Sequence, residues 1–340
     1  MKIASYIAGL VGLALLTGLM LHQGLGGVLH VLGEGGWALL WLVPFHALPL
    51  LLDAQGWRVL LAPRDPDNRA GLPFLFWVAT VREAANRLLP TANIGGEVVG
   101  IRLAKWRVPD GAAVTASVII EVLLTVINQY LFSALGLVLL IAATQATRQT
   151  WTIVTGLVLS LPVPILLGAL LRYGKVFERM ERLAEHMLGD RGKLSALIGG
   201  SNLDAEIRAL YAHHGRLLAA LGWQLAGYIL GSFETWLALY LLGHPIGAWT
   251  AIAIEAMTQA IRHFVFIVPA GIGVQEAGLV LFGHMVGVGN DVALSLSLAK
   301  RAREVLFGTP ALLSWQWLEG RRLHQALNGR AQAPGAPSSS

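Results

Sequence analysis

The sequence predicts an all-α integral membrane protein with about six spanning helices and two re-entrant helical hairpins in an inverted-topology repeat. The first observation is composition: of 340 residues, 55% are hydrophobic and only 13% are charged, whereas soluble domains carry roughly 25% charged residues. The second is a pair of apolar regions interrupted by proline and glycine, and the third is an alternation of basic and non-basic loops. Together they indicate a bilayer protein that encloses a polar site.

Six apolar stretches are long enough to cross a bilayer, which takes a helix of about 20 residues. They run over residues 3–21, 36–61, 112–143, 151–171, 217–242 and 292–317. The first stretch follows Lys2 and is not followed by a small-residue cleavage site. We therefore interpret it as a retained span and not as a signal peptide.

Two interrupted regions, 72–107 and 246–289, follow the second and the fifth span. Each contains a proline seven positions before a glutamate, with glycines between them. Because proline and glycine break helices and each region has two helix-length halves, we expect a re-entrant hairpin in each. The residues expected to form the breaks are Pro90, Gly95 and Gly96 in the first hairpin and Pro269, Gly271 and Gly273 in the second.

The charges of the loops predict the topology, since lysine and arginine accumulate in cytoplasmic loops. The loops after the second span and after the first hairpin are basic, as are the segment from Arg172 to Arg216 and the C-terminal tail. The intervening loops, 22–35, 144–150 and 243–249, hold only Arg148. This alternation fits a protein with both termini in the cytoplasm, in which each hairpin returns to the side that it entered.

Each half of the chain then contains three crossings and one hairpin. Two halves with an odd number of crossings have opposite orientations, which predicts an inverted repeat. The predicted first repeat covers 1–145 and the second covers 146–320, followed by a disordered cytoplasmic tail, 321–340. The second repeat includes the cytoplasmic linker 173–215, whose helical periodicity favours an amphipathic helix on the membrane surface; an ordinary linker is the alternative.

Two of the predicted spans carry groups of polar side chains. The third span carries a stripe along one helical face, formed by Ser117, Glu121, Thr125 and Asn128. A carboxylate facing lipid costs about 2.5 to 3.5 kcal/mol, so this stripe should face protein or a wet cavity. The sixth span carries a basic cluster, Lys300, Arg301 and Arg303, which suits an anionic head group. A static ion pair between this cluster and Glu121 is the alternative.

The hairpins add further polar side chains. Arg82 and Asn86 share a helical face in the first hairpin, and Arg262 lies in the second. Glu97 and Glu276 fall near the starts of the following half-helices, where free backbone N–H groups bind anions. Each glutamate alternatively caps its helix or pairs with the nearby arginine. The candidate substrate-binding residues are thus Arg82, Asn86, Glu97, Glu121, Arg262, Glu276, Lys300, Arg301 and Arg303.

Several classes of function are disfavoured. The chain has no cysteine and no histidine motif with metal-ligand spacing, so we expect no metal and no cofactor. The net charge is +5, but basic residues without interleaved aromatic residues fit cytoplasmic loops better than a nucleic-acid surface. No phosphate-binding loop of the Gly-x-x-x-x-Gly-Lys-Ser/Thr type is present, so we expect that ATP does not drive the protein directly.

Three segments carry a family resemblance: RLLPTANIGGE at 87–97, VPAGIGVQE at 268–276, and KRAR at 300–303. Together they resemble the flippase-like membrane proteins related to the transmembrane region of lysylphosphatidylglycerol synthases. The resemblance implies a bacterial inner-membrane protein that moves a lipid between leaflets, with the hopanoid-biosynthesis branch as the nearest part of the family. Members often have arginine after the glutamate corresponding to Glu121, whereas Val122 stands here, which favours a pair between Glu121 and Arg301.

The expected function is a lipid flippase that works by alternating access, in which arginines hold the head group and carboxylates balance their charge. Synthase activity is not expected, because no large soluble transferase domain follows the last span. The alternatives are an ion-coupled transporter of a small anion and a non-catalytic partner of lipid-synthesis proteins. A membrane-embedded enzyme is a further alternative, but the sequence contains no recognisable acid and base pair for it.

Overall fold

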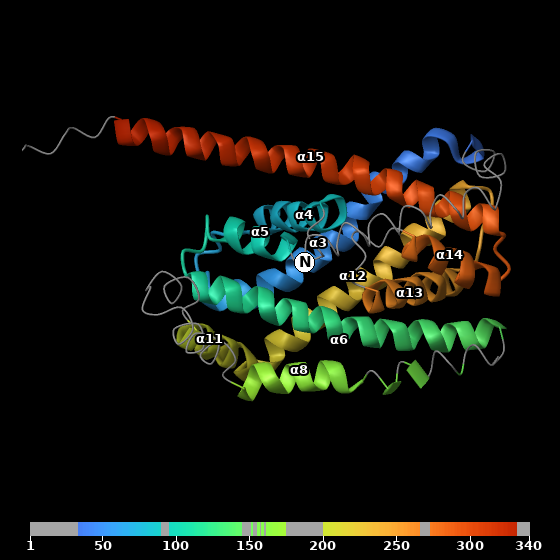
Figure 1. The fold of residues 1–340 in the computed structure, drawn as a ribbon, viewed down its shortest axis with the longest axis horizontal. Coiled ribbons are helices and arrows are strands. Elements are labelled where there is room, and N and C mark those ends of the chain that lie inside the picture. The colour runs from blue at the N-terminus through green and yellow to red at the C-terminus, as the bar shows by residue number, and fades with distance from the viewer. Residues whose placement is uncertain are drawn as a thin grey trace, which may run out of the picture.

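The computed structural model describes residues 33–89, 95–144, 151, 155–156, 158–159, 161–174, 200–265 and 273–331. Within these ranges the chain is helical and contains no strand, which confirms an all-α protein (Figure 1). The first predicted span, 3–21, and the middle of the predicted linker, 175–199, lie outside the described residues. The predicted break residues Pro90, Pro269 and Gly271 also lie outside them.

The first half of the chain folds into a long helix, two half-helices and a second long helix. These elements are η1 (Gly36–Trp41), α3 (Leu42–Leu61), η2 (Ala62–Arg64), α4 (Leu72–Leu88), α5 (Gly95–Ala104) and α6 (Gly111–Thr144). Pro73 lies in the first turn of α4, where a missing N–H costs no helical hydrogen bond. Helix α4 ends at Leu88 because Leu89 is extended, the conformation favoured by a residue that precedes proline.

The second half repeats this order of long and short helices. Its elements are α8 (Pro162–Tyr173), α11 (Gly200–Ala212), α12 (His214–Leu241), α13 (Ala248–Phe264), α14 (Val274–Met285) and α15 (Asn290–Ala331). Gly273 precedes α14 with a φ of 80°, a conformation that side-chain-bearing residues rarely adopt. The predicted hairpins thus correspond to the pairs α4 and α5, and α13 and α14.

The second half-helix of each pair is short. Helix α5 has 10 residues and α14 has 12, and at about 1.5 Å per residue neither reaches across a hydrocarbon core about 30 Å thick. The start of α5 lies against α4 at Gly96. A Cβ at this position would lie only 2.3 Å from the carbonyl oxygen of Arg82 on α4. Glycine at this position therefore allows the two halves of the first hairpin to touch.

The two halves of the chain pack against each other, and each main contact joins a helix of one half to a helix of the other. Helix α3 packs against α12, α4 against α15, and α6 against α13. In Figure 1, α15 runs along the top of the molecule and α6 runs across its lower part, with α4 and α5 between them on the left and α13 and α14 on the right. Helices α8 and α11 pack on α6. One apolar cluster includes Trp57, Leu75 and Leu103, and a second includes Leu239 and Leu279.

Two stretches of the described chain are long and apolar enough to cross a membrane, Gly33–Arg64 and Gly111–Ala143. They contain the predicted second and third spans. Helix α15 does not qualify, although it is long enough, because charged residues such as Arg301, Arg303 and Glu304 lie within its length. The count of six spans and the inverted topology therefore stay predictions.

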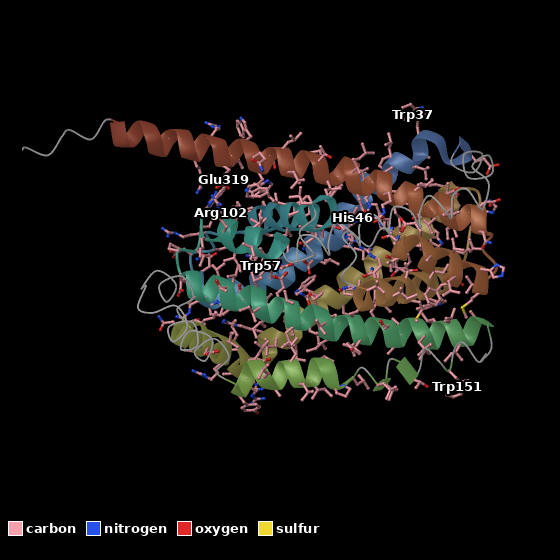
Figure 2. All side chains as sticks on the ribbon, viewed as in Figure 1. Trp37, His46, Trp57, Arg102, Trp151 and Glu319 are labelled. Atoms are coloured by element: carbon pink, nitrogen blue, oxygen red, sulfur yellow. The ribbon has the colours of Figure 1, made fainter. Side chains whose placement is uncertain are left out.

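Helix α15 continues to Ala331, so the prediction of a disordered tail, 321–340, is wrong for its described part, 321–331. Contacts with the first hairpin hold the start of this stretch. Glu319 forms an ion pair with Arg102 at the end of α5, and Figure 2 shows these two side chains near each other between α5 and α15. The guanidinium of Arg322 lies 3.7 Å from the ring centre of Trp106. The end of α15 has few apolar side chains that could pack against other helices, and these polar and aromatic contacts hold it in their place.

Candidate functional site

The first hairpin contains a guanidinium that is shared by two carboxylates. Arg82 on α4 donates from Nη1 to both oxygens of Glu121 on α6, at 3.0 and 2.8 Å, and from Nη2 to Oε2 of Glu97 on α5. Asn86 donates to the other oxygen of Glu97 at 3.4 Å and accepts from the N–H of Gly96 at 2.8 Å. Every carboxylate oxygen of this group therefore has a hydrogen-bond donor.

Neighbouring side chains hold Arg82 in place. The ring of Trp57 on α3 lies 4.8 Å from the guanidinium carbon, a cation–π distance. Trp57 in turn donates from Nε1 to the hydroxyl of Ser117 at 3.0 Å. On the other side, a Cβ on Gly100 would lie 2.4 Å from Cδ of Arg82, so α5 can pack here only with glycine. The guanidinium is thus confined by α3, α5 and α6.

The second hairpin contains a fully buried carboxylate. Glu276 in the first turn of α14 is 0% exposed, and its Oε1 accepts from Nε of Arg301 at 3.0 Å and from the hydroxyl of Ser297 at 3.2 Å. Its Oε2 has no hydrogen-bond partner among the described residues. Arg301 also donates from Nη1 to Glu304 at 2.9 Å. The cation here comes from α15 and not from the hairpin itself.

A histidine joins the two halves of the chain. His46 on α3 lies between two carboxylates, with Nε2 at 2.8 Å from Glu83 on α4 and Nδ1 at 2.9 Å from Glu234 on α12. Arg303 on α15 donates from Nε to the other oxygen of Glu234 at 2.9 Å. Figure 2 shows His46 in the interior, on the side of α3 toward α15.

Arg87 connects this histidine group to the second hairpin. Its Nη1 lies 3.6 Å from Oε1 of Glu304, and its Nε lies 3.8 Å from Oε1 of Glu83. Since Glu304 also binds Arg301, a continuous series of alternating charges runs between α14 and α12. We call this series the charge network; its members are Glu276, Arg301, Glu304, Arg87, Glu83, His46, Glu234 and Arg303.

Lys300 lies in a separate buried group. Its Nζ is 2.5 Å from Oε2 of Glu255 on α13, and the same oxygen accepts from the hydroxyl of Thr235 at 2.5 Å. Gln259 donates to the other oxygen at 3.1 Å. Lys300 and Glu255 are 5% and 7% exposed, so this ion pair joins α13 to α15 away from water.

The structure brings together most of the predicted site residues, but in two groups. Arg82, Asn86, Glu97 and Glu121 lie together at the first hairpin, and Glu276 lies with Arg301 at the second. Lys300 and Arg303 pair with other helices. Arg262 is half-buried in the last turn of α13, and no ion pair joins it to another of the described residues.

The expected pair between Glu121 and Arg301 is wrong. Arg82 binds Glu121 instead, since α4 packs against α5 and α5 packs against α6. Five members of the charge network were not among the predicted site residues: His46, Glu83, Arg87, Glu234 and Glu304. An ionisable residue in the middle of an apolar span, as His46 is, could have been recognised by its cost in hydrocarbon.

Arginine, carboxylate and histidine side chains are types of group that can bind anions and protons. No set of three or more His, Asp and Glu side chains within the described ranges could hold a metal ion. A buried ion pair usually does not repay the desolvation of its charges, so a continuous network of them is weakly explained by stability alone. Arginine forks that already bind carboxylates can bind a phosphate in the same geometry.

The described residues are helical, two of their stretches are long and apolar enough to cross a membrane, and charges are buried between the broken helices, a combination that fits an integral membrane protein. The chain belongs to the family described as the lysylphosphatidylglycerol synthase TM region, whose family model matches residues 6–311. This membership confirms the family predicted from the proline-to-glutamate motifs and indicates a function related to membrane lipids. No curated protein and no solved structure matches the chain.

Proposed function

We propose that the protein translocates a lipid between the leaflets of the bacterial inner membrane by alternating access, without direct use of ATP and without chemical catalysis. The observation that carries this proposal is the charge network, which runs through both hairpin regions and across both halves of the chain. Charged groups within a membrane protein are costly and mark substrate or ion pathways by default.

The packing of the two halves supports an inverted repeat. Suppose that α3, α4 and α6 of the first half correspond to α12, α13 and α15 of the second half. A two-fold axis would then place α3 against α12, and it would relate the contact between α4 and α15 to the contact between α13 and α6. The structure contains all three of these contacts. Transporters built from inverted repeats bind substrate between the repeats and alternate access by moving one repeat against the other.

The arginines supply the binding chemistry of the proposal. Arg82 and Arg301 each bind two carboxylates, so a phosphate-bearing head group can replace one carboxylate without leaving the cation unpaired. The displaced carboxylate then needs a proton or a new partner, which makes Glu97, Glu121 and Glu276 the groups that balance charge during transport. A hopanoid-type lipid with a polar head and an anionic phospholipid are the two substrate classes that we propose.

The loop charges support an orientation with both termini in the cytoplasm. In this orientation the first hairpin enters from the cytoplasm and the second from the opposite side, so that their broken ends approach each other. Lipid-synthesis proteins are the partners that we propose on the cytoplasmic side, because they would supply the lipid.

The test is lipid translocation in vesicles that contain the purified protein. Acyl-labelled fluorescent phosphatidylglycerol or phosphatidylcholine is incorporated, and dithionite reduces only the label in the outer leaflet. The wild type is expected to expose the inner-leaflet label, whereas Arg301→Ala and Glu276→Gln abolish this exposure. The surface pair of Arg64 and Glu206 provides matched controls, Arg64→Ala and Glu206→Gln, which should translocate normally.

Circular dichroism and size-exclusion chromatography check that each variant is folded. Translocation at the wild-type rate by both network variants would remove the charge network from the proposal. Loss in the control variants as well would show that the assay reports general damage.

A non-catalytic partner of a lipid-synthesis complex is the second candidate. This candidate is favoured because the polar groups of the first hairpin already satisfy one another. Arg82 binds two carboxylates, and each carboxylate oxygen accepts a hydrogen bond. A purely structural role predicts that variants of the charge network lower the melting temperature, while the purified wild type gives no translocation of any labelled lipid.

A further inference from the structure

A pocket of about 560 Å³ lies apart from the charge network, where the start of α4, the end of α5 and the last part of α15 meet. Three aromatic and three basic side chains dominate its lining: Phe74, Trp77, Trp106, Arg69, Arg107 and Arg322. We call it the interfacial pocket. No acidic side chain of the described residues lines it, so its electrostatic character is basic.

The aromatic side chains form a continuous wall. The ring centres of Phe74 and Trp77 are 5.9 Å apart, as are those of Trp77 and Trp106. Trp77 is oriented by a hydrogen bond from Nε1 to the hydroxyl of Ser314 on α15, at 2.9 Å. The wall is thus built from α4 and the chain after α5, and it is fixed to the helix on the opposite side.

The arginines of the pocket have no carboxylate partners within the described part of the chain. No acidic group there lies within 4.0 Å of the charged nitrogens of Arg69, Arg107 or Arg322, whereas the interior Arg82 and Arg301 are ion-paired. Instead, the guanidinium of Arg107 lies 5.2 Å from the ring centre of Phe74, and that of Arg322 lies 3.7 Å from that of Trp106. A guanidinium with one face on an aromatic ring keeps the N–H groups at its edge for a ligand.

We propose that the interfacial pocket binds the phosphate-bearing head group of an anionic membrane lipid. The edges of the arginines bind the phosphate in forked geometry, and the aromatic wall contacts the glycerol and the first methylene groups. The adjacent surface favours a lipid over a soluble phosphate, since Leu313 and Trp317 on the same part of α15 are 64% and 60% exposed. Tryptophan and tyrosine gather at the level of the head groups.

This proposal is independent of lipid translocation. The pocket includes none of the charge network, and binding there needs no movement of the two halves. On the predicted topology it faces the cytoplasmic leaflet, where anionic lipids attract basic side chains near the surface by about 1 kcal/mol each. The site would therefore hold a lipid of the inner leaflet, whether or not the protein moves lipids.

The test is lipid binding to the purified full-length protein in detergent, followed by native mass spectrometry. The probes are dioleoyl phosphatidic acid, dioleoyl phosphatidylcholine and inorganic phosphate. The pocket variant combines Arg69→Gln, Arg107→Gln and Arg322→Gln. The matched control combines Arg172→Gln, Arg208→Gln and Arg321→Gln, which remove the same charge at exposed positions outside the pocket.

The wild type and the control variant are expected to bind phosphatidic acid more tightly than phosphatidylcholine, and the pocket variant is expected to lose roughly tenfold or more of this affinity. The single changes Arg322→Gln and Arg321→Gln refine the comparison, because the two residues are adjacent on α15 and only Arg322 lines the pocket. Only Arg322→Gln should weaken binding.

Three outcomes would overturn the proposal. Equal losses in the pocket and control variants would mean that general surface charge attracts the lipid. Displacement of phosphatidic acid by inorganic phosphate at an equal concentration would mean that the pocket is a site for free anions. Equal affinities of the wild type for the two lipids would mean that no head-group site exists.

Discussion

Each hairpin carries a glutamate after its break, but the arginine that pairs with this glutamate comes from a different helix in each case. In the first, Glu97 pairs with Arg82 from the hairpin's own first half-helix, and Arg82 also binds Glu121. In the second, Glu276 pairs with Arg301 from α15, and Arg262 in α13 forms no ion pair with another described residue. The two motifs therefore share the carboxylate after the break, but the arginine that neutralises it lies in the hairpin itself in the first half and in α15 in the second half.

The two sites also differ in how completely their polar atoms are bonded. Both oxygens of Glu97 and both of Glu121 accept hydrogen bonds. In the second hairpin, Glu276 Oε2, Gln275 Nε2 and Thr258 Oγ1 are buried without a hydrogen-bond partner among the described residues. An unpaired buried polar atom costs about 1 to 3 kcal/mol. The carboxylates of the first site are thus fully hydrogen-bonded and form a closed site, whereas the second site leaves buried polar atoms that a proton or a ligand can pair with.

The largest expected effect comes from removing the cation of the closed site. Arg82→Met leaves Glu97 and Glu121 without their cation, and loss of one partner of a buried ion pair costs about 3 to 5 kcal/mol. We expect a large drop in the melting temperature of the detergent-solubilised protein, followed by intrinsic fluorescence. The counterpart change Arg262→Met removes no described ion pair and should alter the melting temperature little. Equal drops would show that the two hairpins do not differ in this way.

A smaller effect is expected from filling the space beside Arg82. A Cβ at position 100 would lie 2.4 Å from Cδ of Arg82, and overpacking a filled interior costs about 1 to 3 kcal/mol. Gly100→Ala should therefore destabilise the protein in thermal unfolding. In the second hairpin the closest atom to a Cβ on Gly278 is 3.1 Å away, so Gly278→Ala should cost less.

Gly222→Ala is the control for these glycine changes, since no atom lies within 4 Å of its Cβ position. Alanine at an exposed position within a helix should stabilise the protein by roughly 0.5 to 1 kcal/mol. Destabilisation by this change would mean that a glycine-to-alanine change is costly here even without a close contact, so that losses at Gly100 and Gly278 would not report contacts.

A comparable or smaller effect is expected from breaking the connection between the two halves. In His46→Gln at least one of Glu83 and Glu234 loses its bond to residue 46, and an unsatisfied buried acceptor costs about 1 to 3 kcal/mol. A double-mutant cycle with Glu83→Gln should give a coupling free energy clearly different from zero. His284→Gln at an exposed position is the control, and a coupling of zero would remove His46 from the network.

The smallest effect is expected at the surface. The ion pair of Arg102 and Glu319 joins α5 to α15, but the Arg102 side chain is 65% exposed. Exposed pairs contribute about 0.2 to 1 kcal/mol, so Arg102→Gln should shift the melting temperature only slightly. High salt should remove the difference from wild type. A loss as large as that of Arg82→Met would mean that the contact between α5 and α15 determines the stability of the first hairpin.

The helices could be predicted from the sequence because local features determine them. The predicted second, third, fifth and sixth spans, 36–61, 112–143, 217–242 and 292–317, correspond to α3 with η1, α6, α12 and α15. Each is a long apolar run, and the half-helices are separated by runs of proline and glycine. Conversely, the helical end of α15 was missed, because it is stabilised by contacts such as that of Arg322 with Trp106, which lie far apart in the sequence.

The candidate site residues could be predicted, but their partners could not. Charged residues in apolar segments are visible in a sequence because of their cost in hydrocarbon. Which charges meet depends on the rotation of each helix and on how far each hairpin folds back. Glu121 illustrates the difference, since its position was predicted and its partner, Arg82 in place of Arg301, was not.

Pro310 divides α15 between its charged part and the part that lines the interfacial pocket. Proline has no N–H, so the carbonyl of Leu306 has no helical donor, and a helix bends most easily at such a position. Helix α15 therefore lacks one backbone hydrogen bond between these two parts, and we expect it to bend more easily there than elsewhere. Such a bend would allow the end that carries Arg322 to shift without breaking the ion pairs of Arg301 and Arg303.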